Sequence, residues 1–506
     1  MNIDTNILGT VTFLLPVITL FIGFLILKWD ALKVSAAAWI VEVLVVLAAY
    51  PDASIIRSTI WANVDLWTGF AVLWTGFIFR QMYTNTGLLQ RLVKVLDSLF
   101  KSSWGKVLTL SGVVGGLIGA FNGFATYPVT IAGIKELGYK GWRAATGYLV
   151  FFSASLAFVS LWIAAHIAEV GSHVPIIDLV PYMGAFSIPL TFLTAFGFAH
   201  ILQINLKEQH NLALLILTAL GSVTGIVIFT LLVPSLYLLT LIGSSMFILL
   251  YLVAYSRAKK LEREKLGIGA GGIIRPFAPI IVGILVILLW KMEPIASIIA
   301  KAEYTLALWN FRPVSINLID NPGFFILVIA LVSYLFRIRS QEPNQKSSNP
   351  IKDIISGSKM GSRTLFTLFL GGGLVGMMLS TGQIATVSHV MADLSAAAYS
   401  GILALFSFIS GIVFAQGIPA DLMLASMQVG VSAAVGLPIA FIVAIAATVV
   451  MGPANPLKPS LLSYTAKVAG APEEDHPRMF RTALLWQIAA LILIVVEVVL
   501  GVIFFV

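Results

Sequence analysis

The sequence contains no cysteine and only six histidines among its 506 residues. The absence of cysteine excludes disulfides, iron–sulfur clusters, haem–thiolate centres and cysteine–zinc sites. The histidines are scattered and never show the HxxxH or HExxH spacing of a helical metal site. We therefore expect no metal centre and no cofactor.

Charged residues are also scarce. Charged residues make up 11% of the chain and hydrophobic residues 59%, whereas soluble domains carry roughly 25% charged residues. The mean hydropathy is +0.98. This composition excludes a soluble enzyme, a coiled coil and a disordered module, and it predicts an all-α polytopic membrane protein. The net charge of +8 then indicates basic cytoplasmic loops, and we expect a lipid bilayer and no nucleic acid as the chain's surroundings.

Apolar stretches long enough to cross a hydrocarbon core of about 30 Å occur throughout the chain. The first one lacks a basic n-region before it, so we expect it to be a retained helix. The sequence predicts about 12 transmembrane helices, at 7–27, 32–50, 62–80, 143–169, 176–204, 211–232, 236–256, 272–295, 322–338, 363–380, 438–469 and 479–506.

Two further apolar stretches, 106–138 and 398–436, are too long for one helix. The motif NGFATYP (122–128) interrupts the first, and QGIPAD (416–421) interrupts the second. Glycine and proline at these positions indicate turns. We predict two re-entrant helical hairpins, with Pro128 and Pro419 opening the return arms.

The basic residues provide an independent test of this topology. All basic clusters become cytoplasmic only if 106–138 enters and leaves on the cytoplasmic side, with both termini outside. The same count places the mouth of the second hairpin outside. Opposite mouths are typical of inverted repeats.

A similarity between the two halves of the sequence supports the repeats. TGLLQRLVKVLDSL begins at Thr86 and TGQIATVSHVMADL begins at Thr381, 295 positions later (381 − 86). Each hairpin is followed by a span that is broken in its middle, by FFSASLAF in the first half and by MGPANPLKPS in the second. We predict a scaffold from 1–100 and 272–397, a transport domain from 101–204 and 398–506, and additional helices with a cytoplasmic loop at 205–271. The broken helices lie at 143–169 and 438–469.

Helix breaks at the bilayer midplane expose free N–H groups that favour anions. Neutral donors at the hairpin tips and breaks fit a small carboxylate; the alternative is that these residues merely make turns. The candidate substrate-binding residues are Asn122, Gly123, Thr126, Tyr127, Ser153, Ser155, Gln416, Gly417, Asn455 and Lys458.

Asp421 follows the second tip in an otherwise apolar arm. A carboxylate at membrane depth is costly and is by default a functional hypothesis, so Asp421 is a candidate proton carrier. The alternative is an N-terminal cap of the following half-helix. Lys458 could attract a substrate carboxylate or neutralise Asp421, or it could snorkel.

Other ionisable residues are weaker candidates. His389 and Asp393 are four residues apart on one helical face and could relay protons, or could simply be solvated. Glu42 and Glu497 lie inside predicted spans and could serve a proton path or helix–helix hydrogen bonds. No GxSxG motif, Walker lysine loop or DDxxD pair is present, so we do not expect an enzyme.

The chain resembles the lactate permease family of bacterial and archaeal transporters. The resemblance covers nearly the whole length, through FRQMYTNTGLLQRLVKVLDSL, GGLIGAFNGFATYPVTIAGIKELGY, FISGIVFAQGIPADLMLASMQVGVSAAVGLP and VMGPANPLKPSLLSYTAKVAG. It implies proton symport of L-lactate and related 2-hydroxymonocarboxylates such as glycolate. By wider analogy with the ion-transporter superfamily, it implies an elevator mechanism on a homodimeric scaffold in the cell membrane of a prokaryote. The first tip departs from the family pattern, because it loses a glycine and gains Tyr127.

The expected function is therefore secondary active transport of a small organic anion, with the proton as the coupling ion. One alternative is a sodium-coupled transporter of another anion, such as a dicarboxylate. A membrane-embedded enzyme acting on lipid-linked substrates and a passive channel are further alternatives.

Overall fold

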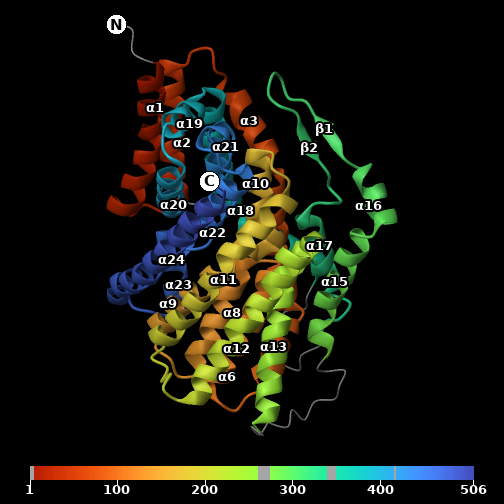
Figure 1. Cartoon of the computed structure of the whole chain (residues 1–506). Coiled ribbons are helices and arrows are strands. Elements are labelled where there is room, and N and C mark those ends of the chain that lie inside the picture. Colours follow the sequence, from red (N-terminus) through yellow and green to blue (C-terminus); the bar gives the residue numbers. More distant parts are fainter. Residues whose placement is uncertain (1–4, 98, 260–273, 339–348, 415–416, 506) are drawn as a thin grey trace.

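The computed structural model describes residues 5–97, 99–259, 274–338, 349–414 and 417–505 (Figure 1). This part of the chain is nearly all helical, as the composition predicts. It also contains one two-stranded antiparallel β-hairpin, in which Tyr304 pairs with Ile316 and Leu306 with Val314. No pattern in the sequence predicts these short strands.

The elements of the first half follow one another in this order. They are α1 (Thr5–Phe21), η1 (Ile22–Ile26), α2 (Ala31–Ala49), α3 (Ile55–Asp65), α4 (Trp67–Asn85), α5 (Leu88–Asp97), α6 (Ser103–Leu108), η2 (Thr109–Val114), α7 (Gly115–Gly119), α8 (Gly123–Glu136), α9 (Gly141–Ser153), η3 (Leu156–Phe158), α10 (Val159–Ser172) and α11 (Ile176–Ile201).

A helical pair and its connections lie between the halves: α12 (Gln209–Ile226), η4 (Val227–Leu232), η5 (Pro234–Leu239) and α13 (Thr240–Ala258). The second half contains η6 (Arg275–Phe277), α15 (Ala278–Trp290), α16 (Glu293–Ala300), β1 (Tyr304–Leu306), β2 (Val314–Ile316), α17 (Pro322–Val332), α18 (Pro350–Ser380), α19 (Gln383–Ala392), α20 (Ala396–Val413), α21 (Gly417–Val435), α22 (Ile439–Met451), η7 (Asn455–Leu457), α23 (Pro459–Ala469), η8 (Glu473–Asp475) and α24 (His476–Phe505).

Several helices begin at polar caps. Asp30, Ser54, Asn321 and Asn349 accept backbone N–H groups of the helix that each precedes. Such caps satisfy N–H groups that have no partner inside the helix. Local sequence therefore fixes where α2, α3, α17 and α18 start.

Ten helices of the described residues are long and apolar enough to cross a membrane, or up to twelve if each of two sharply bent pairs is one span. The chain is thus a multi-pass membrane protein, with about the predicted number of spans. Three predicted spans need correction. The stretch 272–295 bends by 78° where α15 meets α16. In the stretch 322–338, helix α17 covers only eleven residues, which is about 16 Å of helix.

The third correction concerns 62–80. This stretch divides between α3 and α4, and α4 does not reach the apolarity of a lipid-facing span. The reason is its position, because α4 packs between α17, α18 and α10. A helix covered by protein on several sides does not need an apolar lipid-facing surface.

Both predicted hairpins exist as pairs of packed helical arms. In the first, α7 and η2 pack against α8; in the second, α20 packs against α21. With 14 residues, α8 is about 21 Å long and too short to cross the bilayer core. The arms of the second hairpin have 18 and 19 residues, and each is long enough to cross. Its re-entrant character therefore stays a prediction.

Both predicted breaks also occur. In the first, α9 ends at Ser153 and α10 starts at Val159, with a bend of 64° between the two halves. In the second, α22 ends at Met451, and α23 begins at Pro459. Glycine, asparagine and proline in GPANP end α22, because they favour turns over a continued helix.

The two hairpins and the two broken helices pack on each other reciprocally. The return arm of the first hairpin, α8, packs on α23, and the return arm of the second, α21, packs on α10. The long helices that follow the broken helices pack in the same reciprocal way: α11 packs on α22, and α24 packs on α9. In Figure 1, α6 lies at one end of the molecule and α19 at the opposite end.

Candidate functional site

Three helix N-termini lie at the two hairpin tips and the second break, namely those of α8, α21 and α23. A Cβ atom on Gly123, at the start of α8, would lie 3.4 Å from the Cβ of Val159, an extended residue that precedes the left-handed residues of the first break. A Cβ atom on Gly417, at the start of α21, would lie 3.2 Å from Nζ of Lys458, which directly precedes α23. Helix N-termini carry partial positive charge and unsatisfied N–H groups. The start of α21, beside Lys458 at the start of α23, is therefore an environment that favours an anion, whereas the side chain of Asn122 already accepts N–H groups at the start of α8.

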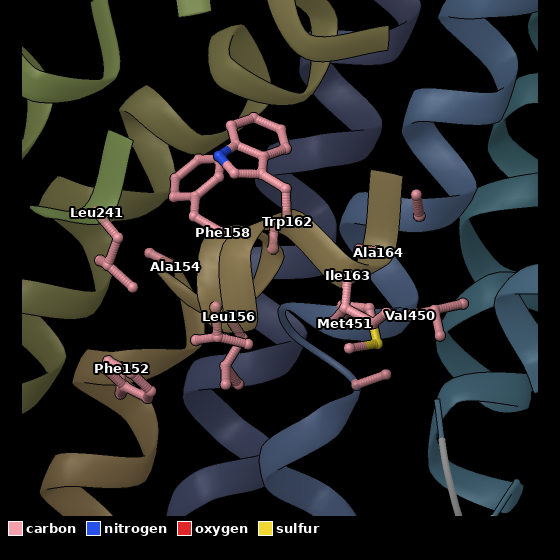
Figure 2. Close-up of a cluster of buried hydrophobic side chains, with 14 of the residues drawn as sticks. Phe152, Ala154, Leu156, Phe158, Trp162, Ile163, Ala164, Leu241, Val450 and Met451 are labelled. Carbon is pink, nitrogen blue, oxygen red and sulfur yellow. The ribbon is translucent and has the colours of Figure 1, made fainter. Parts of the chain in front are cut away.

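An apolar contact connects the two breaks. Figure 2 shows Ile163 of α10 beside Val450 and Met451 at the end of α22. The sulfur of Met451 would lie 2.5 Å from a Cβ atom on Gly417. The two breaks thus meet through aliphatic side chains, with the helix N-termini beside them.

The first hairpin tip is stabilised by Asn122. Its side-chain oxygen accepts the backbone N–H groups of Phe124 and Ala125, at 2.9 and 3.2 Å. The tip also meets the first break directly, because Ala120 accepts a hydrogen bond of 2.8 Å from the backbone N–H of Leu161. The expectation that Pro128 opens the return arm is wrong. Helix α8 begins at Gly123 under the Asn122 cap, and Pro128 lies inside it.

The first break has an unusual backbone. Ser160, Leu161 and Trp162 are left-handed, with φ of 52°, 52° and 65°. Non-glycine residues avoid this region, at a cost of about 1–3 kcal/mol each. Burial holds the segment in place, since the ring of Trp162 is fully buried and lies 4.7 Å from that of Phe158 (Figure 2).

The second tip combines a glycine with a buried ammonium group. Gln416 lies outside the described residues, so its position carries no finding. Gly417 is buried, and Lys458 is 5% exposed. A lysine that snorkels to water would expose its end. Lys458 instead extends into the protein toward the start of α21.

Asp421 lies one turn after Gly417 in α21 and is 1% exposed. Neither of its carboxylate oxygens has a hydrogen-bond partner in the described part of the chain. The cap interpretation is therefore wrong, because a cap accepts backbone N–H groups. Asp421 also forms no ion pair with Lys458 within the described ranges, so Lys458 does not neutralise it by direct contact.

The hydroxyl groups of the candidate residues on the first hairpin and first break mostly donate hydrogen bonds to backbone carbonyls of their own helices. Thr126 donates to the carbonyl of Gly123 at 2.8 Å. Ser153 donates to Val150 at 2.7 Å and accepts from Gln487 of α24 at 3.3 Å. The side chains of Ser155 and Asn455 are half-buried.

Tyr127 is packed among other rings. It is 2% exposed, and its ring meets those of Tyr148 and Phe152 edge-on, with centroids 5.7 and 6.1 Å apart. Such edge-to-face pairs are favourable arrangements of aromatic side chains. Tyr127 is thus part of an aromatic cluster between α8 and α9.

His389 and Asp393 are not part of this arrangement. Both lie on α19 or at its end, and both are exposed. Asp421, by contrast, is fully buried in α21. The structure therefore does not bring these two residues to the hairpin tip.

A hydroxyl-lined cavity that the sequence did not indicate lies beside the first break. It measures about 20 Å³, room for one water molecule, and is too small for an organic anion. Its lining includes Ser111, Ser155, Thr218, Ser222 and Ser245. These hydroxyls are hard to find in a sequence, because serine and threonine also occur in ordinary spans.

A second unforeseen cluster centres on Arg312, in the turn between β1 and β2. Its guanidinium group pairs with Asp65 and with the ring of His173, and it lies 5.4 Å from the ring of Trp61. The indole of Trp61 donates to the carbonyl of Arg312 at 3.1 Å. Burial and the nearby Arg312 charge lower the pKa of His173. The cluster ties α3 to the end of α10.

No protein-family model matches this chain, and no curated protein matches it.

Proposed function

We propose that this chain is a secondary active transporter of small 2-hydroxymonocarboxylates, such as L-lactate and glycolate, driven by proton symport. The observation that carries the proposal is the second hairpin tip. There, the buried Lys458 approaches Gly417, and the buried, unpartnered Asp421 lies one helical turn away. This arrangement supplies a cation for a carboxylate and, close to it, an acid that can carry a proton.

The charge at the site favours one carboxylate. Lys458 is the single basic residue in the segments 120–128, 153–163, 414–421 and 451–459, which contain both tips and both breaks. A dicarboxylate would leave its second charge uncompensated at membrane depth, which is costly. The neighbouring Val159, Ile163 and Met451 suit a short aliphatic group rather than a large polar one.

Asp421 carries the proton in this proposal. A buried carboxylate without a hydrogen bond is strongly destabilised, and protonation removes its charge. When a substrate anion binds next to Lys458, a proton on Asp421 would leave the loaded site with a net charge near that of the empty one. Moving such a loaded site across the membrane costs less than moving an extra charge.

The mechanism that we propose is an elevator built from inverted repeats. The elements of the two halves correspond in order, and α5 and α19 have the same length of ten residues. The reciprocal contacts of α8 with α23 and of α21 with α10 are expected of a pseudo-two-fold axis. In this proposal the hairpins and broken helices move together, while α1–α4, α17 and α18 form the scaffold of a homodimer.

Substrate competition tests this proposal. Purified protein in liposomes loaded with unlabelled L-lactate should take up labelled L-lactate by exchange, and glycolate should compete while succinate should not. Competition by succinate but not by glycolate would favour a dicarboxylate transporter. A flux that does not saturate would instead indicate a channel.

A further inference from the structure

A buried acid–amide pair joins α2 to α19, outside the hairpins and the broken helices. Glu42 of α2 and Gln383, the first residue of α19, are both 0% exposed. The amide nitrogen of Gln383 donates to one carboxyl oxygen of Glu42 at 2.8 Å. The other carboxyl oxygen and the amide oxygen have no partner in the described part of the chain.

The two unpartnered oxygens belong to the same two groups. If Glu42 is ionised, both oxygens are acceptors, and neither can satisfy the other. If Glu42 is neutral, its O–H can donate to the amide oxygen, and the acid and the amide then form two reciprocal hydrogen bonds. One proton therefore satisfies both buried atoms, each of which would otherwise be destabilising without a partner.

The surroundings of Glu42 offer no compensating charge. The elements packed against α2 are η1, α1 and α18, and α19 reaches it through Gln383. No ion pair to Glu42 occurs among the described residues. Among the titratable groups of these elements, Asp30 pairs with Arg363, Tyr50 bonds Thr12, and Asp353 accepts a hydrogen bond from Asn85. The remaining ones are exposed: Lys33, Lys352, Lys359, His389 and Asp393.

Helix α19 connects this pair to the second hairpin. Ser388 of α19 donates to the backbone carbonyl of Met427 in α21 at 3.1 Å. A Cβ atom on Gly430 of α21 would lie 3.4 Å from the Cβ of Ser388, so the two helices approach closely. Movement of α19 would therefore be transmitted to the helix that carries Asp421.

We propose that Glu42 and Gln383 form a proton-binding site in which neutral Glu42 holds α19 against α2. When this proton is lost, the carboxylate of Glu42 lies against the amide oxygen of Gln383. The two oxygens repel each other, and α19 is released from α2. The link from this release to the hairpin rests on the proposed proton-driven transport. The proton-binding site itself does not.

Infrared difference spectroscopy of the protein in lipid nanodiscs tests the site. At neutral pH, the wild type should show a protonated-carboxyl band that Glu42→Gln removes. The matched control Asp393→Asn changes an exposed carboxylate on α19 and should leave this band unchanged. A band that persists fully in Glu42→Gln would overturn the proposal.

A second variant covers the case in which Glu42→Gln does not fold. Gln383→Met keeps the side-chain length but removes the amide, so the Glu42 band should shift to higher frequency as its hydrogen bond is lost. An unshifted band would show that the pair does not form. If the band behaves as predicted but no carboxylate is transported, the proposed function fails while the proton site stands.

Discussion

The ammonium nitrogen of Lys458 lies 3.2 Å from the position that a Cβ atom on Gly417 would occupy. These residues belong to different elements, the second broken helix and the second hairpin. Their proximity places a positive charge at the N-terminus of α21, where the backbone also favours anions.

Replacing Gly417 by alanine should weaken substrate binding at least tenfold, or about 1.4 kcal/mol. The added methyl group would lie 2.5 Å from the sulfur of Met451 and 3.2 Å from Lys458, so both side chains must move. Gly401→Ala is the matched control, because nothing lies within 4 Å of its Cβ position in the same hairpin. Equal affinities for the two variants, measured by equilibrium binding, would disprove the role of this contact.

Replacing Lys458 by methionine should weaken L-lactate binding by about 10–100-fold, because hydrogen bonds to charged groups contribute about 1.5–3 kcal/mol. Methionine keeps an unbranched stem and removes the charge. Lys467→Met, on an exposed position of α23, should retain wild-type affinity. Unchanged binding by Lys458→Met would remove the ammonium group from the site.

Asp421→Asn should abolish proton-driven accumulation while preserving exchange of substrate across the membrane. The amide has nearly the shape of the acid but cannot carry the proton. Asp393→Asn should accumulate substrate like the wild type, since Asp393 is exposed. Normal accumulation by Asp421→Asn, measured in liposomes with an inward proton gradient, would refute the assignment of the proton.

The Arg312 cluster predicts a pH-dependent stability. Because the pKa of His173 is lowered by burial and by Arg312, the folded protein favours neutral His173. This contribution is present above the unfolded pKa of about 6.5 and is lost as the pH falls below it, because the unfolded chain then binds more protons. His173→Asn should flatten the decline of thermal stability between pH 7 and 5.

Asparagine suits position 173, because His173 has φ of +60° at the end of α10 and asparagine tolerates this conformation. Thermal unfolding of the detergent-purified protein measures the effect. An equally steep decline in both proteins would show that His173 does not contribute to it. Arg312→Ala, which leaves Asp65 without its ion pair, should lower stability at every pH.

Much of the architecture was predictable from local sequence. Long apolar runs predicted the number of spans, and the motifs around Asn122 and Asn455 predicted a hairpin tip and a helix break, because asparagine, glycine and proline end helices locally. The prediction of one span at 62–80 is wrong, because α4 is buried by its neighbours and does not need lipid-facing residues. The β-hairpin around Arg312 was missed, because its strands have only three residues each.

The candidate site was predicted less completely. The sequence indicates Asp421 because it is a lone carboxylate in an apolar arm, and Lys458 because it lies between prolines. Gln383 could not be identified, because its partner Glu42 is 341 positions away and a single glutamine carries no signal. The packing of Tyr127 among rings also depends on tertiary contacts that no local pattern encodes.

Accumulation of labelled L-lactate in proteoliposomes tests the central claim most directly. The assay imposes an inward proton gradient, with and without sodium, and compares the wild type with Asp421→Asn. We predict accumulation above the external concentration that a protonophore abolishes, that sodium does not change and that Asp421→Asn lacks. Folded wild-type protein that accumulates no L-lactate under the proton gradient, or does so only with sodium, would contradict the proposed function.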